Sequence, residues 1–200
     1  MIINIRGTSG SGKSTLVRKV MEQFSTVLPS RVIGRRQPQG YHCGPSGGAR
    51  LFVPGHYETA CGGCDTLPAI DLTFNIIANQ AEVYDILFEG IMVSGEWKYT
   101  TALHTKFPGR LHVIVLDTPL DECIKSLLDR RAARGDVRTF DSTRTIRRKS
   151  EVDRMAERLK LQHIPVEYLS REAALLQVLS LLGVGNEVAG GAQGSVTGHT

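Results

Sequence analysis

The chain has 200 residues, of which 41% are hydrophobic and 22% are charged, and its formal net charge is +4. This length suits one domain with a substantial core, and the composition is ordinary for a globular protein. No apolar run approaches the ~20 residues of a membrane span, which argues against a membrane-bound protein. Because the first residues already form an apolar strand pattern, we expect no signal peptide and a cytoplasmic location.

The first element is an apolar strand over residues 2–6, and a helix pattern follows from about 13 to 24. Between them, residues 7–14 read Gly-Thr-Ser-Gly-Ser-Gly-Lys-Ser and fit the phosphate-binding P-loop, G-x-x-x-x-G-K-[ST], without a mismatch. Backbone N–H groups and the start of a helix surround an anion in such a loop. We therefore expect a nucleoside triphosphate to contact Gly7, Thr8, Ser9, Gly10, Ser11, Gly12, Lys13, Ser14 and Thr15.

Within this loop, Lys13 is expected to reach the outer phosphates, and the Ser14 hydroxyl is expected to bind Mg²⁺. Further strand patterns follow along the chain at 31–34, 39–43, 50–54, 85–90, 111–117 and 165–169. Helix patterns separate several of them, at 69–84, 119–134, 141–161 and 171–182. This alternation predicts a parallel sheet with helices on both faces. Residues 1–182 would form one domain, and the Gly-rich residues 183–200 would form a flexible tail.

In a doubly wound sheet, ligands bind at the carboxyl ends of the strands. Glu89 ends the apolar strand 85–90, where it could hold Mg²⁺ or orient the acceptor hydroxyl. It could also simply end a strand in solvent, but Gly90 favours a close approach of a ligand. Asp65, in the loop 55–68, is a candidate general base. An Asp in such a loop could equally be a helix cap or a turn residue.

The same loop offers candidate contacts to the acceptor. His56, Tyr57 and Glu58 could bind it or stack on it, although packing is an equal alternative for Tyr57. The loop after the predicted strand 31–34 falls at the same edge of the sheet, which makes Arg35 a further candidate for substrate binding.

The segment from Arg130 to Lys160 contains eleven Lys or Arg residues against five Asp or Glu. Arginine outnumbers lysine in it, and arginine favours bidentate contact with phosphate. The pattern indicates a helix–turn–helix lid over the triphosphate, with Arg130 and Arg134 acting in catalysis and Arg131 binding the nucleotide. The alternative is a solvated helix face, which charge runs usually form.

Four cysteines remain, Cys43, Cys61, Cys64 and Cys123. Cys61 and Cys64 have C-x-x-C spacing, and Cys43 with a nearby His could complete a zinc site. No second C-x-x-C is present, so we prefer free thiols in a Gly-rich substrate loop.

These motifs resemble the P-loop kinase superfamily, and within it the small kinases that bacteriophages encode. The resemblance rests on residues 7–14, 87–90 and 115–119 and on the arginine-rich segment from Arg130. It implies a three-layer α/β fold with a mostly parallel five-stranded sheet, flanking helices and an arginine-rich helical lid at about 130–160. Residues 54–58 and 62–65 resemble the substrate loop of phage kinases, one group of which phosphorylates 5-hydroxymethyluracil already incorporated in DNA.

The leading hypothesis is an ATP-dependent and Mg²⁺-dependent kinase whose acceptor is the 5-hydroxymethyl group of 5-hydroxymethyluracil in double-stranded DNA. A phage-encoded enzyme of this kind would act in the host cytoplasm. A kinase of a free nucleotide or small metabolite is the first alternative, and a nucleotide-dependent switch or ATPase is the second. The chain lacks the N-K-x-D motif of GTPases and the Asp-Glu strand end of motor ATPases, which favours a kinase.

Overall fold

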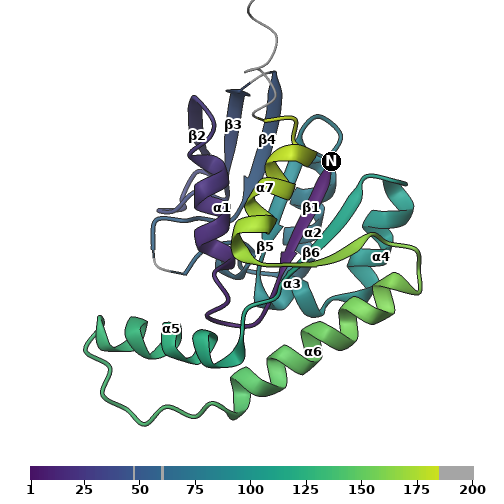
Figure 1. The fold of residues 1–200 in the computed structure, drawn as a ribbon. Coiled ribbons are helices and arrows are strands. Elements are labelled where there is room, and N and C mark those ends of the chain that lie inside the picture. The colour runs from purple at the N-terminus through teal and green to yellow at the C-terminus, as the bar shows by residue number, and fades with distance from the viewer. Residues whose placement is uncertain (47, 60, 185–200) are drawn as a thin grey trace, which may run out of the picture.

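The computed structural model describes residues 1–46, 48–59 and 61–184, so the predicted tail lies outside the described residues from 185 onward. Seven strands of the described part form one sheet in the order β2-β3-β4-β5-β1-β6-β7 (Figure 1). The strands are β1 Ile2–Arg6, β2 Thr26–Ser30, β3 Gly40–Ser46, β4 Ala49–Pro54, β5 Asp85–Glu89, β6 Leu111–Leu116 and β7 Val166–Leu169. The five from β4 to β7 run parallel, whereas β2 and β3 are antiparallel additions. The expectation of five strands is therefore wrong, because a hairpin extends the parallel sheet.

The predicted strand at 31–34 is also wrong. Those residues form a turn, and the strand lies just before them as β2. Pro29 lies inside β2, and a proline in a run argues against a strand unless the strand is at a sheet edge. Strand β2 is such an edge, paired with β3 alone through pairs such as Pro29 with Tyr41. The predicted strands 39–43 and 50–54 are confirmed as β3 and β4, which pair as an antiparallel hairpin.

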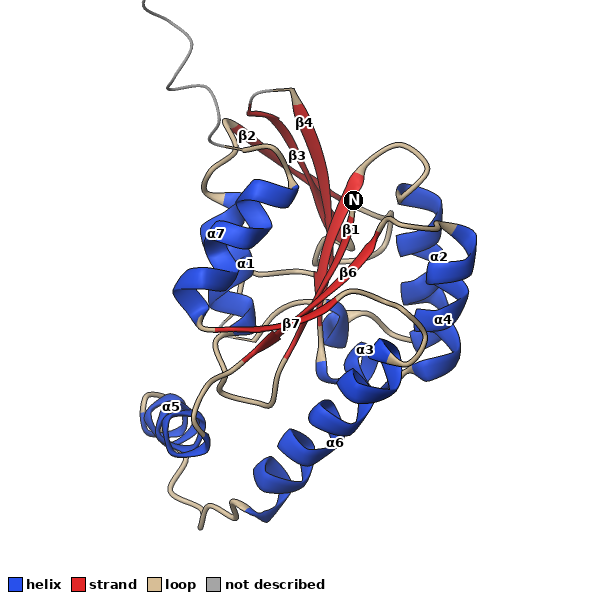
Figure 2. Cartoon of the chain, turned by 45° about the vertical axis from the view of Figure 1, so that its right-hand side comes forward, coloured by secondary structure: helices blue, strands red, loops and turns tan. Residues whose placement is uncertain are grey.

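Helices cover both faces of the sheet, as Figure 2 shows. Helices α1 and α7 lie on one face, and α2, α3, α4 and α6 lie on the side of the other, with α5 beyond the sheet. Their bounds are α1 Lys13–Met21, α2 Ile70–Gln80, α3 Ile91–Gly95, α4 Trp97–Lys106, α5 Leu120–Ala132, α6 Thr143–Lys160 and α7 Arg171–Leu181. Among the described residues, no helix has both the length and the apolar character needed to cross a membrane.

Strand β1 connects the two faces of the core. Ile3 and Ile5 pack towards α1 and α7, whereas Ile2 packs on the opposite face. Arg6 shares the alternation of Ile2 and is fully buried. Its guanidinium donates hydrogen bonds to Asn4 Oδ1 (2.6 Å), to the Ser94 carbonyl (2.8 Å) and to Thr100 Oγ1 (3.0 Å). These bonds hold α3 and α4 against the strand that leads into the P-loop.

Burial lowers the pKa of Arg6 to about 10, yet its guanidinium satisfies three acceptors. Arg6→Met removes all three donors and leaves buried oxygens without a partner. We expect the free energy of unfolding in urea to fall by about 2–4 kcal/mol. The matched control is Arg50→Met on the exposed side of β4, which is expected to change it by less than about 0.5 kcal/mol. Equal effects of the two substitutions would show that Arg6 does not anchor α3 and α4.

Candidate active site

The P-loop joins β1 to α1, as the sequence predicts, and neighbouring elements pack closely on it. Gly10 has φ +83°, and a Cβ atom there would lie 2.2 Å from the Cys123 carbonyl oxygen of α5. Gly12 has φ +98°, and its Cβ would lie 2.9 Å from Arg171 Nε of α7. The Thr8 hydroxyl donates to the Thr145 carbonyl in the first turn of α6, at 3.2 Å. The loop is thus held by three helices besides its own.

The buried side chains of Lys13 and Glu89 lie with half-buried Ser14 at the end of the loop. Lys13 Nζ donates to the carbonyls of Gly7 (2.9 Å) and Thr8 (3.0 Å), and an ammonium has a third N–H for another acceptor. The Ser14 hydroxyl donates to Glu89 Oε1 at 2.7 Å. Strand β5 pairs with β1, which places Glu89 opposite Ile5, directly before the P-loop.

Glu89 is only 2% exposed, so the alternative that it ends a strand in solvent is wrong. Burial raises the pKa of Glu89, and the charge of Lys13 and the Ser14 hydrogen bond partly oppose this rise. Burial likewise lowers the pKa of Lys13, against the opposing charges of Glu89 and Asp65. Three charged groups therefore act on one another at this end of the sheet.

The loop between β4 and α2 folds directly over Glu89. Gly63, with φ +81°, lies so close that a Cβ atom would sit 2.5 Å from Glu89 Oε1. A bridge between His56 and Gly63 closes this loop on itself, and Gly55 packs equally tightly on the Gly63 carbonyl. We call residues 55–68 the acceptor loop. It brings candidate acceptor-side residues to the buried carboxylate.

Asp65 lies on the exposed side of the acceptor loop and caps α3. Its Oδ2 accepts the Ile91 N–H at 2.7 Å, and its Oδ1 accepts the Met92 N–H at 2.9 Å. Gly90 allows this approach, since a Cβ there would be 3.0 Å from Asp65 Oδ1. The contacts of Asp65 are therefore those of a helix cap. The capped helix is α3, which follows β5, and not the helix that follows the acceptor loop in the sequence.

His56 and Tyr57 point into the protein. The Arg18 guanidinium donates to the Tyr57 carbonyl at 3.3 Å and lies 5.6 Å from the centre of its ring. Burial, with a further contribution from Glu89, raises the pKa of Tyr57 well above its usual value. Packing is the role that these contacts give Tyr57. The Nδ1 atom of His56 is buried without a hydrogen-bond partner among the described residues.

Glu58 and Arg35 lie further out on the same edge of the sheet. Glu58 is exposed on the acceptor loop, and Arg35 is half-buried in the connection between β2 and β3. The Gly55 N–H donates to the Gln39 carbonyl at 2.8 Å, which joins this connection to the start of the acceptor loop.

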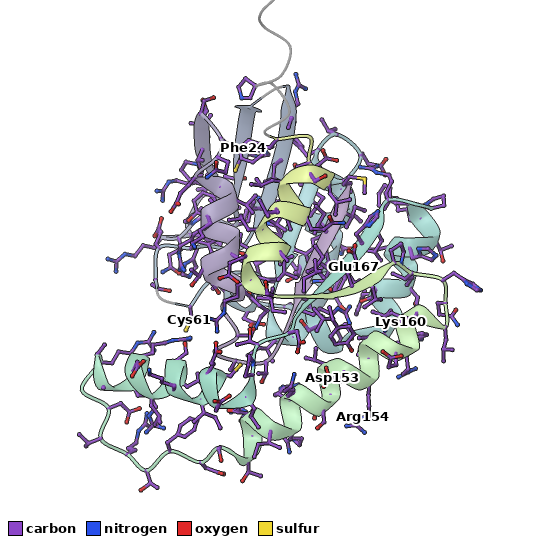
Figure 3. All side chains as sticks on the ribbon, viewed as in Figure 1. Phe24, Cys61, Asp153, Arg154, Lys160 and Glu167 are labelled. Carbon is purple, nitrogen blue, oxygen red and sulfur yellow. The ribbon has the colours of Figure 1, made fainter. Side chains whose placement is uncertain are left out.

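Arg130, in the last turn of α5, and Arg134, in the turn that follows it, reach across to the acceptor loop. Their guanidinium groups donate to Cys61 Sγ at 3.2 and 3.7 Å, and Figure 3 shows Cys61 on the side of the loop that faces α5. Partial burial opposes the change, but these two hydrogen bonds lower the pKa of the Cys61 thiol. The charge of Arg130 also acts on Lys13. Both predicted catalytic arginines thus lie at the mouth of the site.

Arg131 points elsewhere. It forms an ion pair with Asp136 at 3.2 Å, donates to the Arg138 carbonyl, and lies 5.6 Å from the centre of the Phe140 ring. These contacts hold together the connection between α5 and α6.

Arg171 is a residue that the sequence reasoning missed. Its Nε donates to the Ser11 carbonyl at 2.9 Å, and its Nη2 lies 3.4 Å from Glu122 of α5. Two cavities of about 410 and 440 Å³ are each lined by Gly12, Thr15 and Arg171. Arg171 directly follows the predicted strand 165–169, and ligands bind at the carboxyl ends of such strands, so this position could have identified it as a candidate.

The helices α3 and α4 were also not predicted. Helix α3 has only five residues, and α4 contains three threonines, which are weak helix formers. Helix α3 nevertheless lies at the site, because it begins directly after Glu89 and Gly90.

Cys43 and Cys64 are buried, on β3 and in the acceptor loop respectively. Burial raises the pKa of Cys43 to about 12 and that of Cys64 well above its usual value. In residues 1–46, 48–59 and 61–184, no three His, Cys, Asp or Glu side chains cluster as a metal site would require.

The chain is similar in sequence to curated phage proteins. It is 38% identical over 183 residues to the 5-hmdU DNA kinase of Pseudomonas phage PaMx11, an alignment that covers 90% of this chain and 96% of that protein. It is 28% identical to the 5-hmdU DNA kinase of Pseudomonas phage M6, over 73% of this chain and 81% of that protein. No protein-family model matches the chain.

Among solved structures, the deoxyadenosine kinase of M. mycoides with bound dATP aligns with a TM-score of 0.47 and 13% identity. This alignment covers 90% of this chain and 97% of that one.

The raised pKa of Glu89 has a measurable consequence for stability. The carboxyl group of Glu89 binds its proton more tightly in the folded state than in the unfolded state. The stability that this proton contributes to wild type is therefore lost as the pH rises from about 4.5 through the raised pKa. Glu89→Gln has no such proton. We expect its free energy of unfolding, relative to wild type, to be more favourable at neutral pH than at pH 4.5, as measured by urea denaturation. The surface variant Glu82→Gln is the control, and a Glu89→Gln difference that is the same at both pH values would contradict the prediction.

Proposed function

Because the chain belongs to the family of 5-hmdU DNA kinases, we propose that it transfers the γ-phosphate of ATP to the 5-hydroxymethyl group of 5-hydroxymethyluracil in DNA. The observation that carries this proposal is the 38% identity to a 5-hmdU DNA kinase over nearly the whole length of both chains. The geometry agrees with it, because the acceptor loop folds over the carboxylate that contacts the P-loop.

For the donor, we place the phosphates on the backbone of residues 7–15 and on Lys13. The base and ribose would lie in the cavities that Thr15 shares with Arg171. Ser14 and Glu89 offer a hydroxyl and a carboxylate oxygen 2.7 Å apart, and Mg²⁺ prefers such hard oxygen ligands. When bound there, the ion neutralises charge on the outer phosphates.

For the acceptor, we assign Asp65 as the group that receives the proton of the hydroxymethyl oxygen. Its two hydrogen bonds from α3 orient the carboxylate and leave lone pairs on both oxygens. As the acceptor oxygen bonds to the γ-phosphorus, the bond from that phosphorus to the ADP oxygen breaks. Glu89 is less suited to this step, because it is buried and turned towards Ser14.

Arg130 and Arg134 would stabilise the transferring phosphoryl group. Their partner Cys61 is a weak hydrogen-bond acceptor, whereas phosphate is a strong one, so exchange of partners is favourable. We restrict the proposed lid to α5 and residues 133–142, because Val152, Ala156 and Leu159 bury the later turns of α6 in the core.

The direct test is label transfer from γ-labelled ATP to three acceptors: a duplex with 5-hydroxymethyluracil, the same duplex with thymine, and the free nucleoside. We expect label in the modified duplex alone, and Lys13→Ala to abolish it while Lys106→Ala on the distant helix α4 does not. Label in the free nucleoside alone would indicate a small-molecule kinase. Phosphate release without labelled acceptor would indicate an ATPase.

Asp65→Asn separates catalysis from capping. If Asp65 receives the proton, kcat falls about 10²–10⁴-fold while the KM for ATP stays unchanged. The asparagine retains one side-chain oxygen for an α3 N–H, so the thermal midpoint should change by only a few degrees. Asp71→Asn, on the exposed first turn of α2, is the matched control with near-normal kcat. A loss of activity that tracks a loss of thermal stability would leave Asp65 with the capping role only.

A further inference from the structure

Helix α6 carries its charges asymmetrically. At 3.6 residues per turn, five arginines lie on one side of the buried stripe of this helix. We call them the arginine flank: Arg144, Arg147, Arg148, Arg154 and Arg158. Glu151 also lies on this flank, where Arg147 and Arg148 neutralise it at 3.5 and 2.9 Å. The opposite flank carries two lysines and two acids: Lys149, Asp153, Glu157 and Lys160.

A groove of about 610 Å³ runs between the arginine flank and helices α2 and α3. Its floor is apolar, and the edge that α6 forms carries three arginines. The floor consists of Ile70, Ile91, Met92 and Met155, and the rim includes Arg148, Arg154, Arg158, Glu96 and Glu151. The Arg158 guanidinium lies 4.2 Å from the centre of the Trp97 ring, which holds it in place. Arg154 projects from α6 on the side away from the sheet (Figure 3).

The groove leads to the active site. A second cavity of about 340 Å³ is lined by Ser9 of the P-loop and shares Ile91 and Arg148 with the groove. The Ile91 N–H is one of the two donors to Asp65. The groove and this cavity therefore adjoin at Ile91 and Arg148, beside the P-loop and one residue's contact from Asp65.

We propose that this groove holds the DNA strand that carries the acceptor nucleotide, with phosphates on Arg154 and Arg158 and the sugars and bases over the apolar floor. The proposal rests on the proposed function in taking DNA as the acceptor. Its support is the length and sign of the flank. Arg144 and Arg158 are separated by fourteen residues of helix, about 21 Å, which corresponds to roughly six base steps of DNA and exceeds a single nucleotide.

The chemistry of the groove also suits DNA. Arginine binds phosphate oxygens through two parallel N–H bonds, and each flank arginine except Arg154 and Arg158, which are four residues apart, lies within three residues of another. An apolar floor beside one arginine-lined edge matches a strand whose phosphates lie at its edge and whose sugars and bases are less polar. The basic segment then has two functions. The arginines at the end of α5 stabilise the transferred phosphoryl group, and those of α6 bind the DNA.

The test compares two charge reversals on the same helix, Arg154→Glu on the arginine flank and Lys160→Glu on the opposite flank. Both residues are exposed, and both changes alter the net charge equally. A labelled duplex with one 5-hydroxymethyluracil is titrated without ATP, and KM and kcat are measured with ATP. We expect Arg154→Glu to raise the Kd and KM for this duplex about tenfold, with kcat and the KM for ATP unchanged, and Lys160→Glu to change each less than twofold.

Salt dependence gives an independent readout. Arg154→Ala should reduce the slope of log K against log salt concentration by about 0.9, the value for one lost phosphate contact on duplex DNA. The mononucleotide 5-hydroxymethyl-dUMP, which has no neighbouring phosphates, should show the same binding to wild type and Arg154→Glu. Equal effects of Arg154→Glu and Lys160→Glu on the duplex, or an equal loss of mononucleotide binding, would overturn the proposal.

The outcomes separate this inference from the proposed function. If wild type binds the duplex through Arg154 but transfers no label to it, the proposed acceptor is wrong and the DNA groove stands. If label appears in the modified duplex but Arg154→Glu behaves like Lys160→Glu, the proposed function stands and the groove is wrong.

Discussion

A buried carboxylate at the end of β5 connects the parts of the site. Taking Glu89 out of water is costly, and the Ser14 hydroxyl and the Lys13 ammonium offset that cost. Its backbone is fixed by pairing of β5 with β1, the strand that leads into the P-loop. Gly63 then closes over it with no room for a side chain. The phosphate loop, the central strands and the acceptor loop thus share one electrostatic centre.

A second buried charge organises the other half of the site. Arg6 ends β1 and reaches through the core to the Ser94 carbonyl in α3 and the Thr100 hydroxyl in α4. Helix α3 is too short to be stable by itself, so its position depends on such tertiary bonds. Its first N–H groups in turn hold Asp65. Arg6 therefore holds the C-terminal end of the short helix whose N-terminal end orients Asp65.

Elements that a contiguous sequence pattern encodes could be predicted, whereas elements and contacts that depend on residues far apart in the chain could not. The P-loop, its flanking strand and helix, and the strand that ends at Glu89 are contiguous signals, and all lie where expected. Pro29 concealed the edge strand β2, and the threonines of α4 concealed a helix that packs on the core. Asp65 contacts a residue 26 positions away, and Arg171 contacts one 160 positions away. No periodicity or spacing within one segment contains that information.

The basic stretch from Arg130 to Lys160 shows why composition alone gives too coarse a picture. The number of Lys and Arg residues in this segment led us to predict a single lid, yet its arginines lie in three different environments. Arg130 and Arg134 reach Cys61, Arg131 stabilises the connection to α6, and three arginines of the flank on α6 line a groove. The later turns of α6 are fixed by core packing, whereas α5 lies beyond the sheet. A basic helix that is fixed on the core keeps its arginines in place along the groove, so a bound polyanion would meet cations that are already ordered.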